Sequence, residues 1–242
     1  MATPCLPVRD LIGETDQDAA YAVQQEVAAA RAASGARLIG HKIGLTSDAV
    51  QRQFGVKSPD FGALFDDMFF ADREAVALRR FLQPRVEAEV AFVLRDDLDS
   101  PGATVADVIR ATDFVLPAIE IVDSRIAAWD VRITDTIADN ASSGGVVLGS
   151  TPRRLDGMDL PGMGMTLERS GVVLSAGCGA ACLGSPVAAI AWLARALATH
   201  GHALRSGEVV LSGALGPMVT VTSPGSYLAR LDGLGSVCAV LT

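Results

Sequence analysis

The stretch from Gln83 to Leu94 reads QPRVEAEVAFVL and places two carboxylates, two residues apart, inside an otherwise apolar run. Side chains alternate between the two faces of a β-strand, so a strand here has one fully apolar face and carries Glu87 and Glu89 on the other. Neighbouring like charges repel, and burying them is costly unless a cation or protons compensate them. Carboxylate oxygens on a rigid strand suit a hard divalent cation such as Mg²⁺ or Mn²⁺. On spacing alone, a sheet with one solvated face is the more common source of the pattern, because Glu is rarely buried.

Two further residues could belong to such a site. Glu120 is a third carboxylate in an apolar run, LPAIEIV at residues 116–122, and three carboxylates can complete the protein side of a metal site. Lys42 is one of only two lysines among the twenty basic residues and lies in LIGHKIGL, a predicted strand at residues 38–45. Its ammonium group can position a substrate or move a proton. The alternative is an edge-strand lysine that opposes aggregation.

The composition limits the class of protein. Half of the 242 residues are hydrophobic and the mean hydropathy is +0.34, which provides for a sizeable core. A net charge of −8 without basic clusters argues against nucleic acid as a partner. The four cysteines form no CxxC pair or disulfide framework, and no signal peptide is recognised, so we expect a reduced cytoplasmic protein. The uncharged segment 170–194 is long enough to span a bilayer, but its glycines and Pro186 divide it into strand, turn and helix, so we expect buried core rather than a membrane span.

Local patterns predict helices and strands in mixed order. The predicted elements are a helix at 16–33 closed by Gly35, a strand at 37–45, a short helix from the Thr46-Ser47-Asp48 cap to Gly55, a loop at 57–67, the strand at 83–94, a helix opened by Thr104 and Asp107, strands at 114–122 and 146–148, and from 165 onward a strand, a loop, a helix at 187–200 and short strands. Glycines divide those last strands at intervals typical of turns in a strongly curved sheet, a β-roll or barrel, rather than of a βαβ series. We therefore expect one α+β domain over residues 1–242, with a small helical N-terminal part.

Two polar segments have simple explanations. The run DNASSGG at residues 139–145 can line a pocket with amide and hydroxyl groups, but a plain connector is the more ordinary interpretation. Residues 200–202, HGH, end a predicted helix, where a histidine complements the helix dipole and a glycine provides the C-cap.

Six short motifs occur in an order typical of one family. They are GHKIGLTS at 40–47, PDFG at 59–62, PRVEAE at 84–89, EIVDSR at 120–125, DTIADNAS at 135–142 and LGSP at 183–186. With these motifs, the chain resembles the 2-keto-4-pentenoate hydratase / 4-oxalocrotonate decarboxylase group of the fumarylacetoacetate hydrolase superfamily, from about residue 18 to 242. The resemblance implies the fold of the fumarylacetoacetate hydrolase C-terminal type, with a smaller N-terminal part (1–75) and a metal-binding β-roll core (76–242).

The resemblance also implies roles for eight residues. These are Glu87, Glu89 and Glu120 as ligands of Mg²⁺ or Mn²⁺, Lys42 and Asp60 as catalytic residues, and Asp139, Asn140 and Ser142 near the substrate.

The implied activity is a metal-dependent hydro-lyase reaction in the meta-cleavage catabolism of aromatic compounds. In it, 2-hydroxypenta-2,4-dienoate (2-oxopent-4-enoate) binds the metal, is protonated at C5 and takes up water at C4 to give 4-hydroxy-2-oxopentanoate. The sequences of segments 83–87, 133–140 and 207–213 resemble those of the hydratases more than those of the decarboxylases. The alternatives are a 4-oxalocrotonate decarboxylase, for which Arg85 or Arg125 could receive a second anionic group, and a hydratase of a substituted dienoate such as 2-oxohept-4-ene-1,7-dioate.

Two alternatives come from other classes. A C–C hydrolase of the wider superfamily needs a general base, typically histidine, and none of the three histidines is well placed for it. A companion subunit of a neighbouring pathway enzyme would fold but bind no metal. The resemblance implies a homo-oligomer. Association of that oligomer with a neighbouring pathway enzyme is left open. Departures from the group are a short N-terminus and the cysteine-rich segment 177–182, to which we assign no function.

Overall fold

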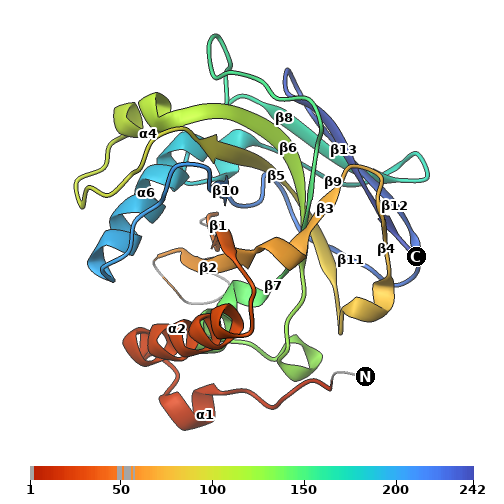
Figure 1. Ribbon diagram of the computed structural model, residues 1–242. Coiled ribbons are helices and arrows are strands. Elements are labelled where there is room, and N and C mark those ends of the chain that lie inside the picture. Colours follow the sequence, from red (N-terminus) through yellow and green to blue (C-terminus); the bar gives the residue numbers. More distant parts are fainter. Residues whose placement is uncertain (1–2, 48–50, 52–55, 57) are drawn as a thin grey trace.

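The computed structural model describes residues 3–47, 51, 56 and 58–242, and its strands form two mixed sheets (Figure 1). The first sheet has the order β2 (Asp60–Phe65), β1 (Leu38–Gly44), β10 (Val209–Leu211), β5 (Arg85–Leu94), β6 (Thr112–Val122), β7 (Ser143–Leu148) and β3 (Phe69–Ala71), with β11 (Val219–Thr220) also paired to β5. The second has the order β4 (Ala75–Val76), β13 (Gly235–Leu241), β12 (Gly225–Leu231), β8 (Gly164–Arg169) and β9 (Val172–Cys178).

The α+β class with mixed sheets is confirmed. Barrel closure is not, because no pairing between described strands joins the two ends of either sheet. The strands β1, β2 and β3 come from the predicted N-terminal part, yet they pair within the same sheet as β5, β6 and β7. The division of the chain at residue 75 stays a prediction.

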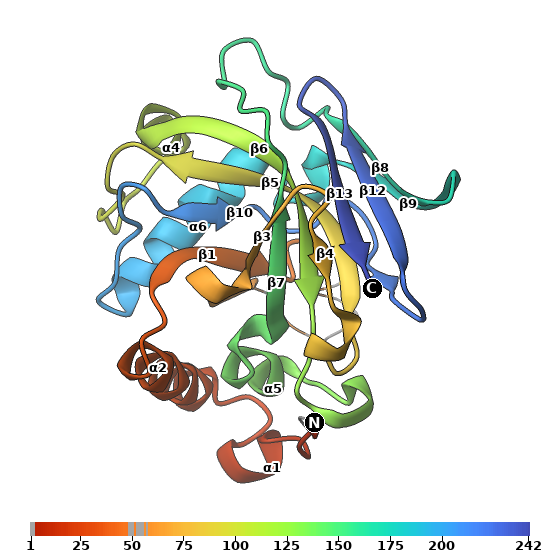
Figure 2. The same cartoon turned by 45° about the vertical axis from the view of Figure 1, so that its right-hand side comes forward.

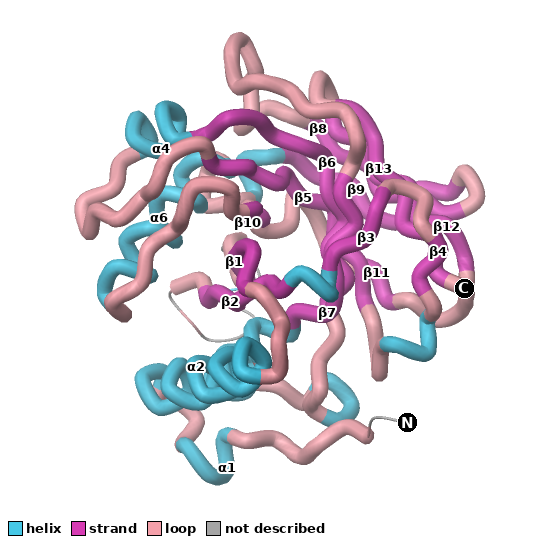
Figure 3. The backbone as a smooth tube through the Cα atoms, in the orientation of Figure 1, coloured by secondary structure: helices cyan, strands magenta, loops and turns pink. Residues whose placement is uncertain are grey.

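The sequence predicts three of the described α-helices to within one residue of their starts, at 17, 105 and 186, and misses two, at 9–12 and 133–138. The helices flank the sheets. They are α1 (Arg9–Ile12), α2 (Gln17–Ala33), α4 (Val105–Ala111), α5 (Ile133–Ala138) and α6 (Pro186–Thr199). The Asp16 carboxylate accepts a hydrogen bond from the Ala19 amide at 3.0 Å and caps α2, while Thr104 and Asp107 form the predicted capping box of α4. Figure 3 shows that α2 and α6 flank the end of the first sheet formed by β1 and β2.

The core lies between the two sheets and under α6 (Figure 2). The apolar face of β5 is buried throughout, as the alternation predicts. The uncharged segment divides into β9, a 3₁₀ turn at Gly179–Ala181 and α6, also as predicted. The helical segment 179–199 is long and apolar enough to cross a membrane, but half of its most apolar 18-residue window is buried inside the fold.

One predicted loop is wrong. Residues 60–65, expected within a loop at 57–67, form β2, and all six are buried. The sequence pattern did not reveal this strand, because both its faces are covered and its sequence DFGALF lacks polar–apolar alternation.

The helix predicted at 46–55 lies largely outside the described residues. The run 139–145 is also more than a connector, since it forms a buried 3₁₀ turn, η4 (Asn140–Ser142), and the start of β7.

Candidate metal centre

The register of the first sheet brings three carboxylates together. Glu87 on β5 lies directly opposite Glu120 on β6, and Glu89 follows two residues later on the same face. One ligand oxygen from each of the three side chains lies within 4.8 Å of the others. Glu89 and Glu120 are 0% and 1% exposed, and Glu87 is partly buried. The prediction of a solvated face, which spacing alone favours, is therefore wrong, because this face of β5 points into the protein.

Lys42 reaches the same cluster from β1. Lys42 pairs with Leu211 on β10, and Leu211 pairs with Ala91 on β5, so the three side chains lie on one face of the sheet. Ala91 is two residues after Glu89 on β5, so Lys42 lies on the same face as Glu89. The Lys42 Nζ lies 2.9 Å from Glu120 Oε1, and the side chain is 4% exposed. The edge-strand interpretation of this lysine is wrong, since β1 is paired on both sides.

The cluster is strongly coupled electrostatically. Burial, reinforced by the charge of Glu120, raises the pKa of Glu87 to about 7 and raises that of Glu89 well above its usual range. Burial alone would lower the pKa of Lys42, but the carboxylates of Glu120, Asp60 and Glu87 outweigh it and the pKa is raised. Lys42 is therefore held as an ammonium ion.

The donor set fits a hard divalent cation. Glu89 Oε1 and Glu120 Oε2 are buried without a hydrogen-bond partner among the described residues. Three ionised carboxylates and one ammonium carry a net charge of −2, which a divalent ion would balance. Oxygen-only ligands are those that Mg²⁺ and Mn²⁺ prefer.

A loop after β10 orients Glu89. The Gly213 amide donates to Glu89 Oε2 at 2.8 Å, and Gly213 has φ +93°, a conformation that favours glycine. A Cβ there would also lie 2.4 Å from Thr46 Cγ2. The buried Cys182 donates from Sγ to the Gly213 carbonyl at 3.0 Å, so this member of the cysteine-rich segment supports the loop.

Asp60, at the start of β2, lies on the same side of the sheet as Lys42. It pairs with Gly44, and Lys42 is two residues before Gly44 on β1. A Cβ on Gly44 would lie 2.2 Å from Asp60 Oδ1, so the glycine makes room for the carboxylate. Thr136 Oγ1 lies 3.0 Å from both Asp60 Oδ2 and the Ile133 carbonyl, so its one proton is shared between two acceptors, whereas Asp60 Oδ1 has no hydrogen-bond partner among the described residues. Burial raises the pKa of Asp60, although Lys42 opposes the shift.

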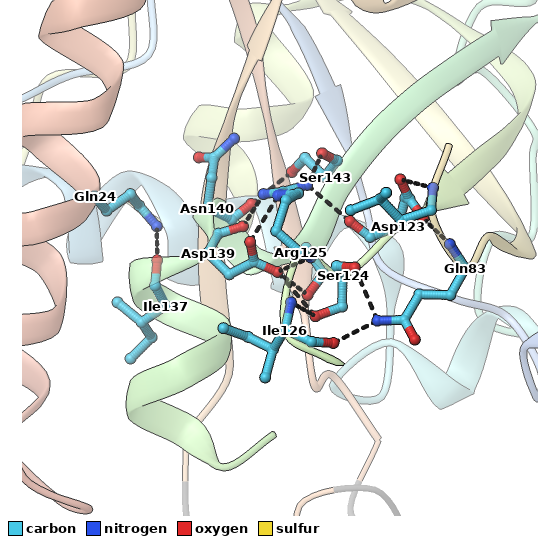
Figure 4. Close-up of polar contacts among 12 residues, drawn as sticks. Gln24, Gln83, Asp123, Ser124, Arg125, Ile126, Ile137, Asp139, Asn140 and Ser143 are labelled. Carbon is cyan, nitrogen blue, oxygen red and sulfur yellow. Dashed lines mark hydrogen bonds and ion pairs between the residues drawn. The ribbon is translucent and has the colours of Figure 1, made fainter. Parts of the chain in front are cut away.

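Asp139, Asn140 and Ser142 form part of a buried polar network (Figure 4). The Asp139 carboxylate accepts from the hydroxyls of Ser124 and Ser142 at 3.0 and 2.9 Å, and its Oδ1 lies 2.6 Å from Arg125 Nε. Burial nevertheless raises the pKa of Asp139. Each of these three side chains thus has protein partners.

The Asn140 side chain links η4 to β2 by two hydrogen bonds. Its amide accepts from the Ala63 N–H at 2.7 Å and donates to the Ala63 carbonyl at 2.8 Å, as a neighbouring strand would. Asn140, Ala141 and Ser142 all have positive φ, at 54°, 49° and 51°, which is costly outside glycine.

Sequence reasoning overlooked three residues of the site, Gly44, Thr136 and Gly213. Thr136 and Gly44 lie inside motifs that the resemblance rests on, but glycine and threonine carry no charge to draw attention to them. His200 has a further contact as well, since its ring lies 4.7 Å from that of Tyr21.

Comparison with known proteins places this geometry in a family. The family model described as fumarylacetoacetate (FAA) hydrolase C-terminal matches residues 39–242. The chain is 58% identical to the TodF product hydratase of Pseudomonas putida F1 and 52% identical to the 2-keto-4-pentenoate hydratase of Paraburkholderia xenovorans LB400, in both cases over 97% of this chain and 87% of the relative.

A solved structure agrees over the whole fold. The 4-oxalocrotonate decarboxylase from Pseudomonas putida G7, complexed with magnesium and adipate, superposes with a TM-score of 0.95 at 34% identity, covering 99% of this chain and 91% of that one. The chain belongs to the fumarylacetoacetate hydrolase family, within its group of 2-keto-4-pentenoate hydratases and 4-oxalocrotonate decarboxylases.

Proposed function

We propose that this enzyme hydrates 2-hydroxypenta-2,4-dienoate (2-oxopent-4-enoate) to 4-hydroxy-2-oxopentanoate with a bound divalent metal. The observation that carries the proposal is the buried cluster of Glu87, Glu89 and Glu120 with Lys42 at its edge. High identity to hydratases along 97% of the chain supports the substrate class.

Glu87, Glu89 and Glu120 would hold the metal, for which we propose Mg²⁺ or Mn²⁺. Support comes from the two buried oxygens of Glu89 and Glu120 that lack hydrogen-bond partners among the described residues, and from the magnesium in the related decarboxylase structure. When bound, such an ion acts as a Lewis acid that stabilises negative charge on a substrate oxygen. The protein contributes a dry, fixed set of carboxylates, of which Glu89 is oriented by the Gly213 amide.

Lys42 and Asp60 take different roles in this proposal. The raised pKa of Lys42 keeps Nζ protonated, so it offers positive charge and hydrogen bonds to an anionic substrate. Asp60 has a raised pKa, and its Oδ1 has no hydrogen-bond partner among the described residues, while Oδ2 lies 3.0 Å from Thr136 Oγ1. We assign proton delivery to substrate carbon C5 to Asp60 Oδ1, and orientation of the reacting groups to Lys42.

Asp139, Asn140 and Ser142 would act near the substrate through the backbone of η4, since their side chains have protein partners. Homo-oligomeric assembly stays a prediction of the resemblance, and a cytoplasmic location stays a prediction of the cysteine pattern and of the lack of a recognised signal peptide. Light scattering of the purified protein checks the assembly.

The decarboxylase is the second candidate, because the solved structure with a TM-score of 0.95 carries that activity in its name. It would need a cation for the second carboxylate of its substrate. Arg125 is already engaged with Asp139 and with the carbonyls of Asp123 and Ser143. Arg85 stacks on Trp129 with its guanidinium carbon 4.0 Å from the ring centre, and its charge acts on Glu87, so we take it as the better candidate of the two.

The test compares two substrates with one protein. Freshly generated 2-hydroxypenta-2,4-dienoate and 4-oxalocrotonate are each incubated with enzyme and Mg²⁺, and products are identified by mass. We expect the dienoate to gain one water and 4-oxalocrotonate to be unchanged. Release of CO₂ from 4-oxalocrotonate without hydration of the dienoate would move the enzyme to the decarboxylases. Inactivity on both would favour the companion subunit.

A further inference from the structure

A buried glutamine on α2 bridges β2, which carries the candidate proton donor Asp60, and α5, which carries its partner Thr136. Gln24 is 5% exposed, and its Nε2 donates to the Phe61 carbonyl and to the Ile137 carbonyl, both at 2.8 Å. Figure 4 shows the side chain reaching from α2 to Ile137. A side-chain amide has two N–H donors, so this one group fixes the separation of two backbones.

Each of these carbonyls lies one residue away from a member of the Asp60–Thr136 pair. Phe61 follows Asp60 on β2, and Ile137 follows Thr136 on α5. The hydroxyl of Thr136 meets Asp60 Oδ2 at 3.0 Å, a contact that requires β2 and α5 to be held in register. Gln24 therefore spans the same two elements as the contact between Thr136 and Asp60 Oδ2.

A second side chain of α2 holds the same strand. Tyr21 lies three residues before Gln24, on the same face of the helix, and its ring stacks on Phe61 at 4.5 Å with an interplanar angle of 19°. Tyr21 stacks on the side chain of Phe61, and Gln24 binds the Phe61 carbonyl and the Ile137 carbonyl. Among the described residues, the Gln24 amide also donates a hydrogen bond to α5.

We propose that Gln24 is a positioning residue, which keeps Thr136 on Asp60 Oδ2 and thereby keeps Oδ1 directed to the substrate. The kinetic consequence rests on the proposed hydratase function. A glutamine that merely attached α2 to the sheet would affect stability, but it would not act through Thr136.

The first test replaces the amide by an apolar chain of similar length. Gln24→Met is expected to lower kcat about tenfold or more, because displacement of a catalytic group by about 1 Å can cost about 100-fold. KM and Mn²⁺ affinity should stay within about twofold of the wild type, since the carboxylate cluster lies on other strands. Gln25 is the matched control, being the adjacent, exposed residue of the same type, and Gln25→Met should leave kcat unchanged.

A double-mutant cycle tests the mechanism. Thr136→Val is expected to lower kcat about tenfold, and Thr136→Ser, which keeps the hydroxyl, should restore most of it. If Gln24 acts through Thr136, the combined Gln24→Met and Thr136→Val variant should be no slower than the slower single variant. Losses that multiply to about 100-fold would overturn the proposal, as would an unchanged kcat in a folded Gln24→Met protein.

The outcome can be separated from failure of the proposed function. A wild-type protein that does not hydrate the dienoate would refute the function alone, and the positioning role is then decided by a crystal structure of Gln24→Met. Loss of the contact between Thr136 Oγ1 and Asp60 Oδ2 would support it, and retention at 3.0 Å would overturn it. If Gln24→Met does not fold, Gln24→Asn replaces it, because its shorter amide cannot bridge both carbonyls.

Discussion

The carboxylate of Glu89 is held by protein on one oxygen only. Its Oε2 accepts the Gly213 N–H, while Oε1 is buried without a partner among the described residues. An unpaired buried charge is among the costliest groups that a fold can contain. An ion or a proton bound to Oε1 would remove this free-energy cost, and we therefore regard the site as a metal centre.

Glu89→Gln should weaken metal binding and leave the fold intact. The amide oxygen can still accept from Gly213, but one anionic ligand is lost. Changes in groups that merely orient ligands cost about 10- to 100-fold in metal affinity, so loss of a ligand should cost at least about 100-fold. Equilibrium dialysis against Mn²⁺ measures this, with the exposed Glu26→Gln as control. Affinity and turnover equal to those of the wild type would count against the site.

Gly44→Ala should reduce catalysis without unfolding the protein. Gly44 is not among the residues with positive φ, so the new Cβ acts only through its approach of 2.2 Å to Asp60 Oδ1. The carboxylate must turn away, and we expect kcat to fall about 100-fold with metal affinity nearly unchanged. Gly102→Ala, whose Cβ would meet nothing closer than 3.8 Å, is the control. Normal kcat in Gly44→Ala would show that Asp60 is not the proton carrier.

At this scale, ionisable residues in apolar strands could be predicted from the sequence alone, whereas glycines that act by making room could not. Glu87, Glu89, Glu120 and Lys42 stand out because ionisable groups in apolar strands need compensation. Gly44 and Gly213 act through the absence of a side chain, and that role exists only once the neighbouring strand or loop is in place.

Among the elements, η4 is the most strained. Its three successive residues with positive φ cost about 1–2 kcal/mol each, and the turn is retained by Asp139, Ser124, Arg125 and the link from Asn140 to Ala63. The strain lies next to β2, and Gly62 on β2 approaches the Asn140 carbonyl so closely that a Cβ would lie 2.5 Å from it. The turn therefore fixes β2 from the side opposite β1.

Asn140→Gly should destabilise the protein by on the order of 3 kcal/mol, because two buried backbone groups of Ala63 lose their partners at about 1–3 kcal/mol each. Asn140→Ala should cost about 1 kcal/mol more, since alanine also disfavours positive φ. Urea unfolding of both variants measures the difference. Equal stability of the two would show that the turn is not strained, and wild-type stability of either would show that the link to Ala63 is unimportant.

The same link explains why β2 could not be predicted. An Asn side chain pairs with one side of this strand in place of a neighbouring strand, and a distant segment supplies it, 77 residues away. Elements with local signals, such as the caps of α2 and α4, were predictable at their ends. Strand β2 depends on partners that no local pattern reveals.

For the whole molecule, mixed α+β architecture could be predicted because glycine-divided strands and capped helices each have a local signature. Closure of a sheet depends on whether its two end strands meet. In this fold β2 and β3 end the first sheet, and no pairing between described strands joins them. Glycine spacing indicates where strands turn, but not whether they close.

The buried carboxylates also make stability depend on pH and metal together. The pKa of Glu87 is about 7 in the metal-free fold and about 4.3 when unfolded, so the folded state binds the proton more tightly. The stability that this proton provides is complete below about pH 4.3 and is lost as the pH rises through 7. A divalent ion binds the deprotonated ligands, so its stabilisation should grow over the same range.

Thermal unfolding in EDTA and in Mg²⁺ at pH 5.5 and 8 tests this linkage. We expect the increase in Tm caused by Mg²⁺ to be larger at pH 8. Glu87→Gln removes one of the titrating carboxylates and should reduce the pH dependence. An increase in Tm that is the same at both pH values in the wild type would contradict the raised pKa.

The most direct measurement titrates metal-free enzyme with Mn²⁺ while following loss of the ultraviolet absorbance of 2-hydroxypenta-2,4-dienoate. If the three glutamates form a catalytic metal site, hydration should be absent in EDTA, rise with added metal and reach its plateau at one ion per chain. Full hydration in EDTA, or a plateau that the Glu89→Gln variant reaches equally well, would contradict the assignment of this cluster as the metal centre of the enzyme.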